Sequence, residues 1–299
     1  MRESELLEHI ERRSRVLAGR GGVEVGPGDD AAVVRLTGET LLTVDQLVGG
    51  RHFDPAKTSV DEIARKAVAR SVSDIAAMGG RPVAGLATGC LPRGCEFGDA
   101  LFDRMFHWAL HWGCPLVGGD ISVSDGPLVL TVTVAGRVHE SRGAVLRSGA
   151  RAGDSVYVTG ALGGSLVSGR HLSFEPRVEE AAWLCGLLGD RLRSMIDLSD
   201  GLGRDAARVG RASGVRVRLE AAALPLHRGV ADWRAGASDG EDYELLFTVE
   251  RGAMVPACCE ATGTAVTRIG TVVAGTGCVI VGESGEEYGA ENLGWEHSG

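Results

Sequence analysis

The chain has 299 residues, 44% of them hydrophobic, and 31 Lys and Arg against 40 Asp and Glu give a formal net charge of −9. The acidic balance argues against a general nucleic-acid-binding protein, and the hydrophobic content argues against a disordered chain. No stretch approaches the roughly 18 uninterrupted apolar residues of a membrane-spanning helix, and residues 1–20 lack the apolar core of a secretory signal. The length favours two domains of about 150 residues each.

The first half of the chain alternates between helical and strand patterns. A capping box formed by Ser59 and Glu62 predicts the start of a long helix, and Gly79-Gly80 predicts its end. The expected elements are a helix at 5–18, strands at 31–36 and 41–48 joined by a turn at Thr37-Gly38, a helix at 60–78, a strand at 83–91, a helix at 97–112, and strands at 115–117 and 128–138.

A polar, turn-rich segment at 147–154 marks the expected domain boundary, which gives domains 1–146 and 147–299. Helices and strands alternate in both halves, so the sequence predicts an α/β or α+β fold of two domains. In the second half we expect strands at 155–159, 194–197, 215–219, 243–249, 266–272 and 277–281, and helices at 162–170, 178–188, 201–213 and 252–262.

The seven cysteines are odd in number and contain no Cys-x-x-Cys spacing, and Cys258 and Cys259 are adjacent. This pattern favours reduced thiols in a cytoplasmic protein over a disulfide framework or a zinc site. Lysine is scarce, since Lys57 and Lys66 are the only two.

Aspartate recurs beside glycine at the ends of apolar segments. The five places are Asp29-Asp30, Asp45, Gly119-Asp120, the run from Asp197 to Gly201 and the run from Asp239 to Asp242. A single Asp-Gly pair is most often a turn. Strand-end loops of α/β proteins converge where ligands bind, however, and carboxylates gathered there repel one another unless cations lie between them.

A sixth acid, Asp74, lies inside the predicted helix 60–78 next to Ile75-Ala76-Ala77. An ionised group on an apolar helix face is costly unless it is paired or bound to a metal, and the alternative is a surface residue or a partner of Arg70 one turn earlier. Oxygen ligands without His or Cys spacing favour Mg²⁺ or Ca²⁺. Because Mg²⁺ uses few carboxylates together with substrate phosphates, the acids indicate several magnesium ions and a phosphate-bearing substrate.

The usual nucleotide-binding motifs are absent from the sequence. No Gly-Lys dipeptide is present for a Walker A loop, no His-Arg-Asp or Asp-Phe-Gly marks a protein kinase, and no Gly-x-Gly-x-x-Gly marks a dinucleotide site. A protein of this sequence that handles ATP must therefore do so by another route.

In their order along the chain, these motifs resemble the thiamine-monophosphate kinase family of the aminoimidazole-ribonucleotide synthetase-like superfamily. The resemblance spans about residue 26 to Trp295. The matching segments are residues 26–33 (GPGDDAAV), 43–48 (TVDQLV), 52–53 (HF), 66–67 (KA), 73–79 (SDIAAMG), 118–120 (GGD), 147–150 (RSGA), 153–154 (GD), 196–202 (IDLSDGL) and 240–245 (GEDYEL).

The resemblance implies that ATP and thiamine monophosphate give ADP and thiamine diphosphate, the last step of thiamine diphosphate biosynthesis, with several Mg²⁺ ions. It implies a homodimer in which the N-terminal sheet pairs with its copy, and a C-terminal α+β domain that completes each site. The implied metal ligands are Asp30, Thr43, Val44, Asp45, Asp74, Asp120, Asp197 and Asp200. The implied ATP contacts are Gly119, Asp120, Arg147 and Ser199, the implied contacts to thiamine monophosphate are His52, Glu241 and Trp295, and the residues expected to matter most for catalysis are Asp45, Asp120 and Arg147.

The chemistry suits this set of residues. The nucleophile would be a substrate phosphate oxygen that is already ionised at neutral pH, so no general base is required, and the protein mainly positions phosphates and screens their charge. Arg147 would donate to a phosphate in two places, and the aromatic face of Trp295 suits a cationic or aromatic ring.

The sequence departs from the family pattern at several places, which include the end of the chain at His297-Ser298 and a short connection before Pro176-Arg177. Val44 stands where Thr is usual, Asp239 adds an acid, and residues 121–125 (ISVSD) replace a Thr-Thr-Arg run and so remove a positive charge. Three other interpretations therefore stay open: an enzyme of the same fold that acts on another phosphorylated metabolite, a non-catalytic paralog that binds nucleotide or thiamine phosphate, and a protein stabilised by Ca²⁺ alone.

Overall fold

The computed structural model describes residues 3–17, 22–25 and 31–295. The chain divides into two compact units, of which one comprises residues 1–75 and 81–138 and the other residues 76–80 and 139–299. The functions expected of residues 1–146 and 147–299 stay predictions. No helix in the described ranges is long and apolar enough to span a membrane.

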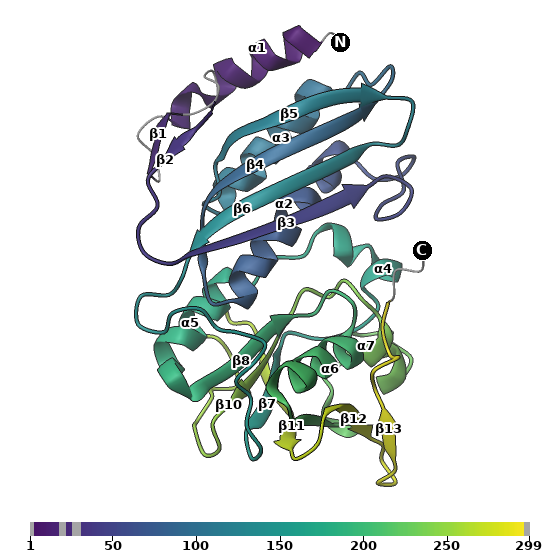
Figure 1. The fold of residues 1–299 in the computed structure, drawn as a ribbon. Helices are drawn as coiled ribbons and strands as arrows, with labels where there is room; N and C mark the ends of the chain where they lie inside the picture. The colour runs from purple at the N-terminus through teal and green to yellow at the C-terminus, as the bar shows by residue number, and fades with distance from the viewer. Residues whose placement is uncertain (1–2, 18–21, 26–30, 296–299) are drawn as a thin grey trace. The chain divides into compact units, whose positions relative to one another are not determined.

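The first unit is built on a four-stranded sheet with the strand order β3-β6-β4-β5. β6 pairs antiparallel with both β3 and β4, and β5 pairs parallel with β4. Figure 1 shows α2 and α3 on one face of this sheet. The elements are α1 (Glu3–Ser14), η1 (Arg15–Leu17), β1 (Val23–Val25), β2 (Val33–Val34), β3 (Thr40–Val48), α2 (Val60–Ala77), β4 (Arg81–Pro92), α3 (Gly98–His111), β5 (Leu116–Ser124) and β6 (Val129–Arg137).

Helix α2 begins at the predicted capping box. The backbone N–H of Ser59 donates to the Glu62 carboxylate (2.8 Å), and the N–H of Glu62 donates to the Ser59 hydroxyl (3.2 Å). After the helix, Gly79 takes a φ of 72°, a conformation that glycine adopts without a steric penalty. Apolar side chains of α2, among them Val68, Val72 and Ile75, are buried.

The opposite face of the four-stranded sheet carries exposed apolar side chains. Leu42 is 74% exposed and Val44 60% exposed on β3, and Leu86 is 44% exposed on β4. The pairing register places Val44 level with Thr133 and Thr133 level with Leu86, so these side chains share one face. An exposed apolar patch on a sheet marks a surface suited to an interaction.

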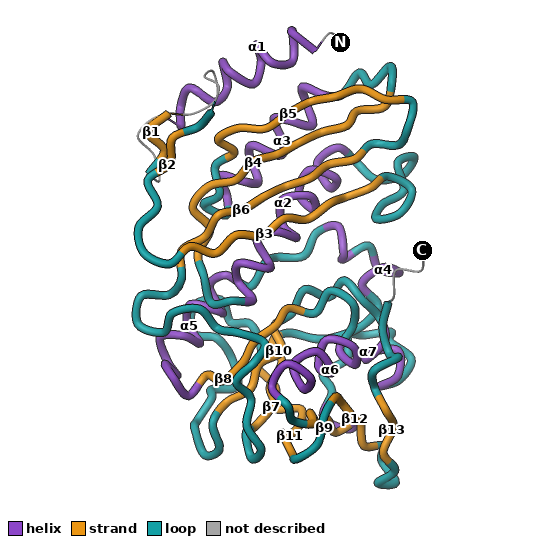
Figure 2. Tube along the Cα trace, viewed as in Figure 1, coloured by secondary structure: helices purple, strands orange, loops and turns teal. Residues whose placement is uncertain are grey.

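The second unit contains a seven-stranded sheet with the strand order β13-β12-β9-β11-β7-β10-β8 (Figure 2). Only the β9–β12 pair is parallel, and α6 packs against β9 and β12 around a core that includes Val217, Ile269 and Ile280. The elements are β7 (Ser155–Thr159), α4 (Ser165–Ser168), η2 (Arg170–Leu172), α5 (Val178–Leu188), η3 (Gly189–Arg191), β8 (Leu192–Asp197), α6 (Leu202–Ser213), β9 (Arg216–Glu220), η4 (Ala221–Ala223), α7 (Trp233–Ser238), β10 (Leu245–Val249), β11 (Val266–Val273), β12 (Gly277–Val281) and β13 (Glu287–Gly289).

Several predicted elements are wrong. No helix forms at 252–262, because Pro256 lacks a backbone N–H and disfavours the helical conformation of the residue before it. The predicted helix at 162–170 is reduced to α4, which ends at Gly169 with a φ of 75°. The strand predicted at 31–36 is reduced to β2, which pairs with β1 and not with β3.

The strand predicted at 115–117 continues through Gly118, Gly119 and Asp120 to Ser124. A Cβ atom built on Gly119 would lie 1.8 Å from the carbonyl oxygen of Ala87 on β4. The two strands therefore approach so closely that only glycine fits at this position.

Replacing Gly119 with Ala is expected to destabilise the protein by about 1–3 kcal/mol, because the added methyl group must displace the β4 backbone. Gly89→Ala on β4 is the matched control, since the atom nearest to its added Cβ would lie 3.6 Å away. Chemical denaturation followed by circular dichroism measures both variants. Equal stability of the two would contradict the close approach.

Candidate functional site

In the first unit, β3 and α2 bring three of the predicted metal ligands together. The hydroxyl of Thr43 donates a hydrogen bond to the carboxylate of Asp74, which is on the facing helix. Asp45 forms an ion pair with Arg70 of α2 (3.2 Å), and Arg70 also donates to the backbone carbonyl of Gln46 (2.8 Å). Thr43 and Asp45 lie two residues apart on a strand, so both side chains face the helix.

Val44 lies between these two residues and points to the other face of the sheet, where it is 60% exposed. If Val44 binds the same metal ion as Asp45, the ligand must therefore be its backbone carbonyl oxygen. Asp30 lies outside the described residues, as do the other residues at 26–30.

Asp120 and Gly119 lie on the edge strand β5. Asp120 is level with Thr88 of β4, and Thr88 is level with Thr131 of β6, which is level with Gln46 of β3. This register places the side chain of Asp120 on the face opposite that of Asp45, so one chain does not bring these two carboxylates together through its sheet.

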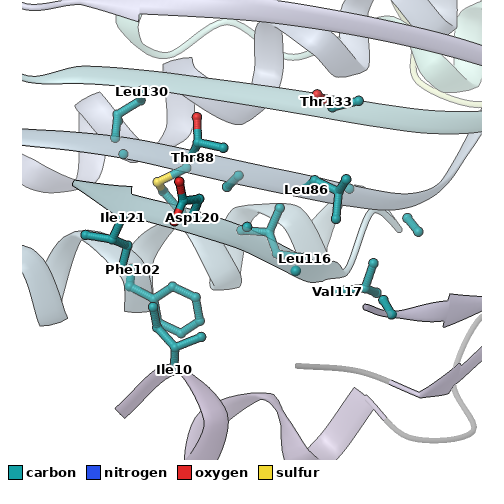
Figure 3. A pocket seen from close by; sticks show the side chains of 18 of the residues that line it. Ile10, Leu86, Thr88, Phe102, Leu116, Val117, Asp120, Ile121, Leu130 and Thr133 are labelled. Atoms are coloured by element: carbon teal, nitrogen blue, oxygen red, sulfur yellow. The ribbon is translucent and has the colours of Figure 1, made fainter. Parts of the chain in front are cut away.

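The Asp120 side chain lines a cavity of about 900 Å³ in the first unit. Figure 3 shows Asp120 beside Thr88, with Ile10 of α1 and Phe102 of α3 on the other side of the opening. Most of the remaining lining is apolar and includes Leu42 and Leu86, so the cavity is a hollow in the exposed apolar face of the sheet with one carboxylate at its wall.

His52 is fixed in a turn that follows β3. Its Nδ1 accepts a hydrogen bond from the N–H of Val48 (2.9 Å), which places the ring proton of the neutral imidazole on Nε2. The carbonyl of His52 accepts from the ammonium group of Lys66 (2.9 Å), a side chain that is fully buried. Lys66 thereby holds the turn that carries His52.

In the second unit, β8 and β10 bring two loops together. β8 ends at Asp197, which is level with Leu245 at the start of β10. The N–H of Glu241 donates to the carbonyl of Ser199 (2.8 Å), and the N–H of Trp295 donates to the carbonyl of Asp200 (2.8 Å). The predicted ligands Asp197 and Asp200 therefore lie beside three predicted contacts to ATP or acceptor, namely Ser199, Glu241 and Trp295.

Two residues that the sequence did not point out hold Asp200. Arg208, two turns into α6, forms ion pairs with both Asp200 and Asp205. Asp205 also accepts a hydrogen bond from the N–H of Asp200 (3.0 Å), and burial raises the pKa of Asp205 to about 6. The only sequence signal for this pair is the three-residue spacing of Asp205 and Arg208 on a predicted helix.

The structure does not place Arg147 within this group. The carbonyl of Arg147 accepts from the hydroxyl of Ser213 (3.2 Å) at the last residue of α6, whereas Asp200 precedes the first turn of that helix. The 12 residues of α6 span about 18 Å at the usual rise per residue. The Arg147 side chain is exposed.

The chemistry of the donor atoms decides whether these carboxylates suit a magnesium ion. Within the described parts of the chain, no group of three or more His, Cys, Asp and Glu side chains is arranged to hold a metal ion. The pair Asp45 and Asp74 and the pair Asp197 and Asp200 supply only oxygen donors. Such pairs fit Mg²⁺, which binds through one or two carboxylates and completes its coordination with phosphate oxygens and water.

Comparisons with known proteins identify the relatives of this chain. Residues 28–138 match the family model "AIR synthase related protein, N-terminal domain". The thiamine-monophosphate kinase of Rhodopirellula baltica is 37% identical over 299 residues, which cover 92% of this chain and 90% of that protein. The thiamine-monophosphate kinase of Escherichia coli K12 is 35% identical and covers 95% of this chain and 94% of its own length.

The chain belongs to the thiamine-monophosphate kinase family. Among solved structures, the thiamine-monophosphate kinase of Stenotrophomonas maltophilia K279a matches with a TM-score of 0.79 and 28% identity, and the match covers 96% of this chain and 98% of that one. AaThiL complexed with AMPPCP and TMP matches with a TM-score of 0.73 and 28% identity, over 100% of this chain and 99% of that one. The predicted family, fold class and enzyme class are thereby confirmed.

Asp242, next to Glu241, is a second acid whose charge the structure disfavours. Its carboxylate accepts from the N–H of Gly163 (2.8 Å) and pairs with Arg170 (3.0 Å). Burial nevertheless raises the pKa of Asp242 to about 7, because these two partners offset only part of the desolvation.

A folded-state pKa above the unfolded value means that the folded protein binds the extra proton, so this group destabilises the fold as pH rises from about 4 to about 7. Asp242→Asn mimics the protonated side chain. We expect the free energy of unfolding of the variant to increase relative to that of the unmodified protein between pH 4 and pH 7, in denaturant titrations at each pH. A difference that stays constant with pH would contradict the raised pKa.

Proposed function

We propose that this enzyme transfers the terminal phosphoryl group of ATP directly to thiamine monophosphate and forms thiamine diphosphate and ADP, the last step of thiamine diphosphate biosynthesis. The observation that carries the proposal is the match over the whole chain to AaThiL complexed with AMPPCP and TMP. AMPPCP is an ATP analogue with a carbon bridge in place of the β–γ oxygen, so that structure holds a nucleotide and an acceptor together.

The ATP end of the site is assigned to the first unit. The edge strand β5 carries Gly119, which can meet a phosphate only through its backbone, and Asp120, whose side chain is exposed. On the other face of the sheet, the hydroxyl of Thr43 orients the carboxylate of Asp74, and Arg70 balances the charge of Asp45. Mg²⁺ held by Asp45 and Asp74 would screen phosphate charge on that face, whereas Asp120 would act on the opposite face.

The predicted contacts to the acceptor are proposed separately for each unit, Trp295 and Glu241 in the second and His52 in the first. Trp295, which is 55% exposed, would offer an aromatic face to the thiazolium or pyrimidine ring. Glu241 would accept a hydrogen bond from the aminopyrimidine, and the Nε2–H of His52 would donate one. The attacking phosphate oxygen of the acceptor is already ionised at neutral pH, so none of these residues needs to remove a proton.

The ligand roles are tested with Asp45→Asn and Asp120→Asn, each of which removes a charge without changing the shape of the side chain. Loss of a carboxylate that holds Mg²⁺ or phosphate is expected to lower kcat by about 100-fold or more. A coupled ADP-release assay with ATP, Mg²⁺ and thiamine monophosphate measures kcat, with added EDTA to show that turnover requires the metal.

The matched control is Asp125→Asn, because Asp125 lies just beyond β5, is 82% exposed and pairs with Arg93, which is itself 71% exposed. Its kcat should stay within about twofold, as expected for an exposed ion pair. Circular dichroism of all three variants verifies that each is folded. A kcat like that of the unmodified protein in Asp45→Asn or Asp120→Asn would remove that residue from the site.

We also propose that the enzyme is a homodimer in which the open face of the four-stranded sheet packs against its copy. The exposed side chains of Leu42, Val44 and Leu86 support this, since a monomer leaves them in water. Leu42→Glu should shift the protein to a monomer in size-exclusion chromatography with light scattering, while Leu166→Glu in the second unit should not. A monomeric unmodified protein would contradict the proposal.

The cytoplasm remains the proposed compartment. All seven cysteines are free thiols in the structure, which is usual in a reducing environment.

The HypE structure in complex with ATP shares the fold at a TM-score of 0.76, but at 18% identity it supports the fold alone. No observation in the site favours another phosphorylated acceptor over thiamine monophosphate.

A further inference from the structure

Four consecutive residues of the loop that carries Glu241 each contact a different residue of one short segment. We refer to residues 241–244 as the acceptor loop and to residues 170–177 as the supporting segment. Nδ1 of His171 lies 3.1 Å from Oε2 of Glu241, and Nη2 of Arg170 lies 3.0 Å from Oδ1 of Asp242. The rings of Phe174 and Tyr243 stack with their centroids 3.8 Å apart. Arg177 donates to both carboxylate oxygens of Glu244, at 2.7 and 2.5 Å.

The acceptor loop has a backbone that needs such support. Glu241 has a φ of 62° and Tyr243 a φ of 52°, and across the described ranges these are the only non-glycine residues with a positive φ. Side chains disfavour this conformation, and it persists where the surrounding structure holds it in place, commonly at functional sites. The supporting segment contacts both of these residues and the two acids that flank Tyr243.

The supporting segment is itself anchored at both ends. Arg170 donates to the carbonyl of Gly163 (2.9 Å), whose N–H donates to Asp242. At the other end, Arg177 pairs with Glu180 (3.4 Å), a buried carboxylate that also accepts from the hydroxyl of Thr264 (2.6 Å). The segment is therefore tied at both ends to residues outside it.

Within the supporting segment, His171 contacts Glu241, the residue proposed to bind the acceptor. A carboxylate can only accept hydrogen bonds, so a hydrogen bond across the 3.1 Å contact requires the proton to be on Nδ1 of His171. The side chains of His171 and Glu241 are 11% and 17% exposed, so water competes little for this contact. One oxygen of Glu241 is thus fixed from within the protein.

We propose that His171 is a positioning residue that sets the specificity for the acceptor by orienting the Glu241 carboxylate, and that the supporting segment holds the acceptor loop in its strained shape. The ligand recognised in this way is one that presents a hydrogen-bond donor such as the amino group of an aminopyrimidine. This inference rests on the proposed function, in which Glu241 binds thiamine monophosphate.

The test compares three substitutions of His171. Asn places its amide nitrogen close to the position of Nδ1, Gln places it close to that of Nε2, and Ala removes the donor. In His171→Ala we expect KM for thiamine monophosphate to rise about tenfold and KM for ATP to stay unchanged, as for loss of a hydrogen bond to a charged group. His171→Asn should restore KM to within about threefold, and His171→Gln should not.

Should His171→Ala fail to fold, the comparison of His171→Asn with His171→Gln carries the same test. His139→Ala is the matched control, since His139 hydrogen-bonds to Ser141 (3.2 Å) outside the acceptor loop, and its KM values should not change. An unchanged KM in His171→Gln, or an equal rise of KM for both substrates, would overturn the role of His171.

A double-mutant cycle shows whether His171 acts through Glu241. If it does, adding His171→Ala to Glu241→Gln should raise KM for thiamine monophosphate no further than Glu241→Gln alone. Multiplicative effects of the two substitutions would overturn the coupling. The unmodified enzyme is assayed beside them: if it forms no thiamine diphosphate, the proposed function itself fails, whereas turnover with unaffected His171 variants rejects only this inference.

Discussion

Pairing of carboxylates with arginine is the interaction on which the candidate site residues of each unit depend. Arg70 pairs with Asp45, Arg208 with Asp200, and Arg177 with Glu244. Carboxylates gathered in one region repel one another unless they are paired, and burial penalises their charge. A guanidinium group stays charged and can donate to two acceptors at once, so a single arginine can fix the position of a carboxylate. The two lysines of the chain form none of these three ion pairs.

The strand register then decides which acids can act together. Thr43 and Asp45 face α2 because they lie two positions apart on β3, and the same alternation turns Val44 to the open face. Asp120 faces away from Asp45 within one chain. In the second unit the pairing of β8 with β10 sets the loop after Asp197 against the acceptor loop, so two turns that are remote in sequence form one surface.

Local signals in the sequence predicted most of the fold that carries the site. The capping box at Ser59 located α2 correctly, and the order of the acidic motifs along the chain was enough to indicate the family. The sequence could not show that Gly119 lies inside a strand, because its need for glycine arises only from the approach of Ala87 on another strand. Nor could it reveal Arg170 as the partner of Asp242, since the two residues are 72 positions apart.

The central claim is that the acceptor is thiamine monophosphate and that its phosphate is the nucleophile. In the most direct measurement, the purified protein is incubated with ATP and Mg²⁺ in three reactions, which contain thiamine monophosphate, thiamine or no acceptor. The products are identified by chromatography. We predict thiamine diphosphate and an equal amount of ADP with thiamine monophosphate alone. ADP release without thiamine diphosphate, or a product formed equally well from thiamine, would contradict the account.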